Sequence, residues 1–100
     1  MKKILLVCAA GMSTSLLVEK MKAHAKEIGE EIDIEALSIS EASDKIAHVD
    51  IVMLGPQVRY QEKQIKEMAD GRIPVTVIDM MDYGKMDGAA VLTKALATIH

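Results

Sequence analysis

Aromatic side chains are nearly absent from this chain. It has no Phe and no Trp, and its two aromatic residues are Tyr60 and Tyr83. Proteins that bind single-stranded nucleic acid stack the bases on aromatic rings, so a platform of that kind is excluded. A sugar-binding groove lined with rings is excluded for the same reason. The formal net charge of −3 also argues against a nucleic-acid partner, because binding to phosphates requires a basic surface.

Cysteine is equally scarce, since Cys8 is the only one in the sequence. A single cysteine excludes an internal disulfide and any zinc or iron–sulfur site built from several cysteines. A lone thiol fits a reducing compartment. No apolar run approaches the roughly 20 residues that a membrane helix needs, and the run before Cys8 is too short for a signal peptide. We therefore expect a cytoplasmic protein without direct membrane insertion.

What is present is ordinary globular composition, with 50% hydrophobic residues in a chain of 100. A chain of this size forms one domain, which we expect to cover residues 1–100. Four short β-rich runs alternate with helical patterns of apolar residues. Strands are expected at residues 3–8, 32–37, 50–54 and 75–78, and helices at 13–28, 40–47, 59–69 and 88–99.

This alternation predicts an α/β fold in which a four-stranded parallel sheet has helices on both faces. Right-handed crossovers leave few topologies, and we favour the strand order 2-1-3-4. In such sheets ligands bind at the carboxyl ends of the strands, where the strand order reverses. Two loops converge there in the predicted topology, at residues 8–15 and 55–60. We expect a monomer, because the sequence pattern leaves no apolar surface for contact between subunits.

The segment after the first strand has the features of a phosphate-binding loop. Its small residues let the backbone come close to a ligand, and its amides and the dipole of the next helix converge on one point. The helix has no acidic residue before Glu19, so its positive end is left for an anion. The predicted phosphate-binding residues are Ala9, Ala10, Gly11, Met12, Ser13, Thr14 and Ser15.

Cys8 begins this loop and is the candidate nucleophile. The field of the loop favours the thiolate form, which attacks phosphoryl groups. A loop of the low-molecular-weight phosphatase type would have Arg where this chain has Thr14, so a phosphatase-like or arsenate-reductase-like enzyme is the alternative hypothesis. A binding module that holds an anion without chemistry is a third, and a buried structural thiol is the plain interpretation of Cys8.

Three segments resemble the IIB components of the bacterial phosphotransferase system (PTS), in the lactose/cellobiose (chitobiose) class. They are CAAGMSTSLL at 8–17, LGPQVRY at 54–60, and VID with YGKMDG between 77 and 88. The resemblance implies a phosphotransferase that takes a phosphoryl group on Cys8 from the phosphohistidine of a IIA protein. It also implies that the group passes to a sugar, a β-disaccharide such as cellobiose, chitobiose or lactose, bound in the membrane transporter IIC. No cofactor and no metal are implied.

Other residues near the predicted site have less definite roles. Gln57, Tyr60 and Tyr83 are candidates for accessory or partner contacts, and a surface or interface position is the plain interpretation of each. Met12, Leu16 and Val58 are candidates for an apolar collar around the cysteine, while inward packing is the alternative for Leu16. Asp79 follows the fourth strand, where we favour a structural role as a cap of the next turn.

Overall fold

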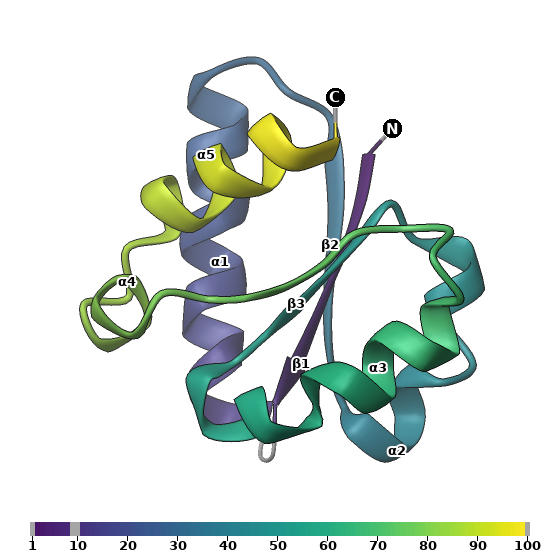
Figure 1. Cartoon of the computed structure of the whole chain (residues 1–100). Coiled ribbons are helices and arrows are strands. Elements are labelled where there is room, and N and C mark those ends of the chain that lie inside the picture. Colours follow the sequence, from purple (N-terminus) through teal and green to yellow (C-terminus); the bar gives the residue numbers. More distant parts are fainter. Residues whose placement is uncertain (1, 9–10, 100) are drawn as a thin grey trace.

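The computed structural model describes residues 2–8 and 11–99, and of residues 11–14 it describes the backbone. Four parallel strands form one sheet in the order β2-β1-β3-β4 (Figure 1). The strands are β1 (Lys2–Cys8), β2 (Ile32–Ser38), β3 (Ile51–Leu54) and β4 (Val75–Val77). The predicted fold class and strand order are therefore confirmed.

Helices connect the strands, and their bounds differ in part from those predicted. They are α1 (Gly11–Glu27), α2 (Ile39–Ala42), α3 (Glu62–Ala69), α4 (Met80–Gly84) and α5 (Gly88–Ile99), with 3₁₀ helices η1 (Ile46–His48) and η2 (Pro56–Gln61). The helix expected at 40–47 is wrong as one element, because it is divided into α2 and η1 around Ser43 and Asp44, residues that disfavour helix interiors. The helix expected at 59–69 is preceded by η2, which opens at Pro56, and the short α4 was not predicted.

The strand order follows from the apolar content of β1. Ile4, Leu5, Leu6 and Val7 are fully buried, so both faces of this strand must be covered. β1 pairs with β2 on one side and with β3 on the other, and Leu6 lies between Ala36 and Met53. The strand is thus the centre of the sheet, and Cys8 is at its end.

Side chains alternate along β1 between two separate cores. Ile4 and Leu6 pack with α1, α4 and α5, whereas Leu5 and Val7 pack with α2, η1, η2 and α3. Figure 1 shows α1 and α5 on one side of the sheet and α2 and α3 on the other. Each fully buried aliphatic side chain contributes roughly 1.5–3 kcal/mol to folding. Because the side chains alternate, the face on which a β1 residue lies can be assigned from its position in the strand.

The carboxyl ends of parallel strands share one edge of the sheet, which we call the carboxyl edge. It carries Cys8 from β1, Ser38 from β2, Leu54 from β3 and Val77 from β4. The helices α1, α2 and α4 and the 3₁₀ helix η2 all begin at this edge, because each follows a strand directly. Of the residues predicted to carry function, Cys8 ends β1, residues 11–15 lie at the beginning of α1, and Gln57 lies at the beginning of η2.

Candidate functional site

Cys8 is the last residue of the central strand, and its side chain is 2% exposed. Two positions earlier Leu6 faces the α1 side of the sheet, so the alternation places the Cys8 side chain on that same side. Along the carboxyl edge Cys8 lies between Ser38 of β2 and Gly55, which follows β3 and whose amide donates to the carbonyl of Val7 at 2.8 Å. Strand neighbours therefore flank the thiol on both sides.

Helix α1 begins at Gly11, three residues after Cys8 and two residues earlier than predicted. The first four amides of a helix have no partner inside it, and the helix dipole adds a partial positive charge at that end. The first turn contains no acidic residue, so nothing in α1 competes for this end. An anion attached to Cys8 would be stabilised there.

The structure divides the predicted phosphate loop into three parts. Ala9 and Ala10 lie outside the described residues. The backbone of residues 11–14 forms the first turn of α1 instead of a loop, so the expectation that the helix starts at Ser13 is wrong. Ser15 is also in α1, with an exposed side chain. Their contact with phosphate stays a prediction.

Gly55 brings Gln57 and Cys8 to the same place. A Cβ atom added to Gly55 would lie 3.4 Å from Cβ of Cys8 and 3.0 Å from Oε1 of Gln57. The Gln57 side chain therefore folds back from the start of η2 over Gly55, although it remains exposed to solvent. The predicted convergence of the two loops holds for Cys8, Gly55 and Gln57, which lie close together at this point.

Ser38 is a neighbour of Cys8 that the sequence analysis missed. It pairs with Cys8 in the β1–β2 register, and its hydroxyl donates to Oε1 of Glu41 at 2.8 Å and lies 3.1 Å from Oγ of Ser40. Serine followed three residues later by glutamate is a capping pattern, and Ser38 is the N-cap of α2, although its side chain bonds Glu41 instead of the helix amides. This capping pattern can be recognised in the sequence, but only the register between β1 and β2 shows that Ser38 lies beside Cys8.

The two tyrosines occupy different environments. Tyr60 is 74% exposed on η2, whereas Tyr83 of α4 is 7% exposed and belongs to the core between the sheet and α1. Val58, a candidate for the apolar collar, is buried in the opposite core, so that expectation is wrong for Val58. Leu16 is exposed, which agrees with a place in the collar and disagrees with inward packing.

Several exposed apolar side chains belong to elements that begin at the carboxyl edge. Leu16 lies in the second turn of α1, Tyr60 lies on η2, and Met80 and Met81 form the first turn of α4. Each of these elements begins next to the end of a strand. A partner that approaches Cys8 would meet these apolar side chains together with the charged residues between them, such as Arg59 and Asp82.

Asp79 caps α4, as favoured from the sequence. Its Oδ1 accepts hydrogen bonds from the amides of Met81 at 2.8 Å and Asp82 at 3.3 Å. These amides lower the pKa of Asp79, and Lys94 adds a smaller contribution in the same direction. In turn, Asp82 raises the pKa of Lys94 through the hydrogen bond that joins α4 to α5.

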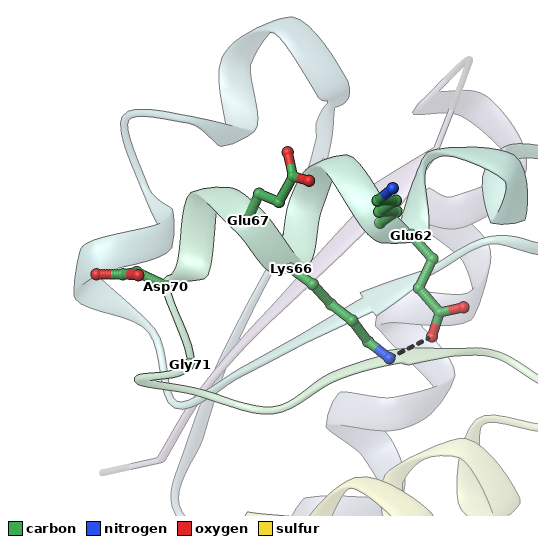
Figure 2. A pocket seen from close by; sticks show the side chains of 6 residues that line it. Glu62, Lys66, Glu67, Asp70 and Gly71 are labelled. Atoms are coloured by element: carbon green, nitrogen blue, oxygen red, sulfur yellow. Dashed lines mark ion pairs between the residues drawn. The ribbon is translucent and has the colours of Figure 1, made fainter.

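A hollow along α3 is lined by charged side chains of both signs (Figure 2). Figure 2 shows Lys66 reaching Glu62, with the two charged atoms 3.2 Å apart. Glu67, Asp70 and Gly71 complete the part labelled there. Exposed ion pairs of this kind are typical of a solvated helix face, and we do not place the site there.

Neither a metal cluster nor a membrane helix is found in the part of the chain that the structure describes. Across residues 2–8 and 11–99, no three His, Cys, Asp or Glu side chains gather as metal ligands would. No helix within the same ranges has the length and apolarity to span a membrane.

Comparison with known proteins assigns the family. The family model described as "PTS system, Lactose/Cellobiose specific IIB subunit" matches residues 3–94. The chain belongs to this IIB family. Its resemblance to IIB components, inferred from three short segments, is thereby confirmed. IIB components are phosphotransferase domains that work with IIA and IIC partners.

Relatives and solved structures agree with this assignment. The chain is 47% identical over 98 residues to the oligo-beta-mannoside-specific EIIB component of Bacillus subtilis (strain 168), with coverage of 97% of this chain and 95% of the relative. It is 41% identical to the cellobiose-specific EIIB component of Lactococcus lactis subsp. lactis (strain IL1403), covering 94% and 93%.

The fold of this IIB chain matches that of solved IIB structures. The cellobiose-specific IIB component of Borrelia burgdorferi superposes with a TM-score of 0.82 at 38% identity, covering 98% of this chain and 91% of that one. The lactose-specific IIB domain of Streptococcus pneumoniae gives a TM-score of 0.87 over 99% and 98% of the two chains. The second match is 20% identical and supports the fold alone.

Proposed function

We propose that this IIB chain is a phosphocarrier in which Cys8 receives a phosphoryl group from a phosphohistidine of IIA and passes it to a sugar in the transporter IIC. The observation that carries the proposal is the position of Cys8. It ends the central strand, faces the α1 side of the sheet, and precedes by three residues a helix whose first turn has no acid. The phosphate on the cysteine would be stabilised by the amides of residues 9–15.

In the first transfer the sulfur of Cys8 attacks phosphorus, the S–P bond forms and the N–P bond of phosphohistidine breaks. The imidazole nitrogen keeps the bonding electron pair and takes up a proton, and the thiol gives up one, so atoms and charge balance. In the second transfer a sugar hydroxyl oxygen attacks phosphorus, the O–P bond forms and the S–P bond breaks. The sulfur of Cys8 keeps the bonding electron pair, and the proton released by the sugar hydroxyl balances the one that restores the thiol. Both steps depend on in-line positioning and preorganised donors, which is what a carrier supplies.

We infer a β-linked disaccharide, such as cellobiose, chitobiose or lactose, as the sugar. Two relatives are named for β-linked sugars, oligo-beta-mannoside and cellobiose, which supports a β-glycoside, whereas a third is named for galactose, so the names do not agree on one sugar. We further propose that the chain works as a monomer in the cytoplasm, where a lone thiol stays reduced.

The test is phosphorylation of the pure protein. We would incubate it with phosphoenolpyruvate, the general phosphotransferase proteins and a IIA partner, and then measure its intact mass. The expected result is a gain of one phosphate that maps to Cys8. Cys8→Ser should gain none, because a serine hydroxyl stays protonated and is a far weaker nucleophile than a thiolate.

A matched control is Ser40→Ala, which alters an exposed hydroxyl near the same edge and should still be phosphorylated on Cys8. Turnover of an aryl phosphate without any gain in mass would contradict the carrier and favour the phosphatase-like enzyme. Binding of inorganic phosphate with neither modification nor turnover would favour a binding module.

A further inference from the structure

The residues that flank Cys8 along the carboxyl edge differ in the hydrogen-bonding groups that they provide on the β2 side and on the β3 side. On the β2 side the proton of the Ser38 hydroxyl is donated to Glu41 at 2.8 Å. A hydroxyl has one proton, so the Ser38 hydroxyl has only its lone pairs left for another partner. A phosphate dianion needs donors instead. The β2 side is therefore a poor source of stabilisation for phosphocysteine.

On the β3 side the neighbour is Gly55, which has no side chain, and the carboxamide of Gln57 occupies the space above it. Oε1 of Gln57 lies 3.0 Å from the place where a Gly55 Cβ would be, and that place is 3.4 Å from Cβ of Cys8. Gln57 also borders a surface hollow with Pro56, Met80 and Tyr83. The carboxamide is thus both close to Cys8 and open to an incoming partner.

A carboxamide carries two N–H donors and one carbonyl acceptor. Within the part of the chain that the structure describes, the carboxamide of Gln57 makes no hydrogen bond. Its last torsion is soft, and a half-turn exchanges the carbonyl for the NH₂ end at the same position. The group can therefore turn a donor toward Cys8 without breaking another bond.

We propose that Gln57 is a ligand of the phosphoryl group on Cys8, donating from the β3 side in addition to the backbone amides at the start of α1. Because Gly55 has no side chain, the carboxamide of Gln57 can lie close to Cys8. The inference rests on the proposed function, because it requires that Cys8 be phosphorylated. It adds a side-chain donor to the backbone amides at the start of α1.

The decisive measurement is an equilibrium. Phospho-IIA and IIB exchange the phosphoryl group, and the equilibrium constant depends only on the separate proteins before and after exchange. A contact that exists only in the IIA–IIB complex changes the forward and reverse rates equally. A ligand of phosphocysteine changes the equilibrium constant itself, because it stabilises one of the end states.

For Gln57→Ala we expect the equilibrium to shift toward phospho-IIA by roughly tenfold or more, as for the loss of one hydrogen bond to a charged group. Gln57→Glu should shift it further, because a carboxylate repels the dianion. Gln64→Ala is the matched control, since Gln64 is also an exposed glutamine, placed on α3. It should leave the constant unchanged. Quantitative ³¹P NMR of the mixture gives the ratio.

Gly55→Ala provides a second test. The backbone of Gly55, with φ −62° and ψ 148°, suits alanine. The new methyl would meet Oε1 of Gln57 at 3.0 Å, which is too close, but Cβ of Cys8 at an ordinary 3.4 Å. It should therefore displace the carboxamide and leave Cys8 in place. We expect the same shift as for Gln57→Ala, and no additional shift in the double variant.

The outcomes separate this inference from the proposed function. If Cys8 is phosphorylated and Gln57→Ala changes the rates but not the equilibrium, Gln57 is a partner contact and the inference is wrong. If the wild-type protein is never phosphorylated, the proposed function fails first. Because the Gln57 side chain is exposed, its variants should fold, which a thermal unfolding curve checks.

Discussion

A single glycine sets the distance between the two helices on one face of the sheet. A Cβ atom on Gly88, at the start of α5, would lie 2.6 Å from the backbone nitrogen of Met21 and 2.7 Å from the carbonyl carbon of Lys20 in α1. Both contacts involve backbone, which cannot rotate away. The close approach of α5 to α1 therefore requires glycine at this position.

We expect Gly88→Ala to lower the free energy of unfolding by roughly 1–3 kcal/mol, the cost of overpacking a tight contact. Gly84→Ala is the control, because nothing lies within 4 Å of its added Cβ and Gly84 ends the helix α4. Alanine should leave stability unchanged or raise it by up to about 1 kcal/mol there. Urea unfolding measures both. Equal effects of the two variants would contradict the close-packing argument.

Residues differ in how far sequence alone can place them. Cys8 could be placed at a strand end because an aliphatic run stops there and small residues follow. Gln57 could be brought near it because the predicted topology makes their loops converge. Ser38 could not, since its approach depends on the register between β1 and β2, which loop lengths do not determine. The burial of Tyr83 also depends on a helix, α4, that is too short to show a periodic pattern.

At the scale of elements, α4 depends on its cap. Asp79 accepts hydrogen bonds from the amides of Met81 and Asp82, and these lower its pKa from the model-peptide value of 3.8. A carboxyl group with a lowered folded-state pKa stabilises the folded state above its unfolded-state pKa. That contribution is lost as the pH falls through the lower folded-state pKa.

We therefore expect α4 to loosen in acid, starting near pH 4 and continuing below the lowered pKa of Asp79. Asp79→Asn keeps an oxygen acceptor but does not titrate, so its α4 should show less dependence on pH in this range. Amide hydrogen exchange at Met81 and Asp82 is the measurement. The prediction fails if acid accelerates exchange equally in both proteins.

The prediction of elements succeeded where apolar periodicity was long and failed where it was short. Helices α1 and α5 carry stripes over several turns, and both were expected within two residues of their observed bounds. The segment 40–47 has a strong start but contains Ser43 and Asp44, and it forms two short pieces. At η2 the chain first makes a 3₁₀ turn, and Val58 departs from helical geometry before α3 begins.

At the scale of the whole molecule, the sheet separates two cores that share no side chains. Ile51 belongs to the α1 core and Ile65 to the α3 core. We expect Ile51→Val and Ile65→Val to cost roughly 0.5–1.5 kcal/mol each, and their costs to add within about 0.5 kcal/mol. Equilibrium unfolding of the single and double variants measures this.

A matched pair tests the reverse case. Ile4 and Ile51 are register partners on neighbouring strands and lie in the same core. Ile4→Val combined with Ile51→Val should deviate from additivity by more than the pair on opposite faces does, because the two cavities share neighbours. Similar deviations for both pairs would contradict two independent cores. The topology that creates these cores could be predicted from sequence, since strand–helix alternation and right-handed crossovers leave few arrangements.

The central position of β1 in the sheet limits how Cys8 could exchange a phosphoryl group with its partners. β2 pairs with β1 through Cys8 and β3 pairs with it through Val7, so the backbone of Cys8 cannot swing from a donor to an acceptor. If Cys8 carries the phosphoryl group as proposed, donor and acceptor must instead take turns at one small surface. The rate of phosphoryl transfer is then limited by how quickly one partner dissociates and the next one binds. A flexible tether between this domain and its transporter, which raises the local concentration to about the millimolar range, would shorten the second wait.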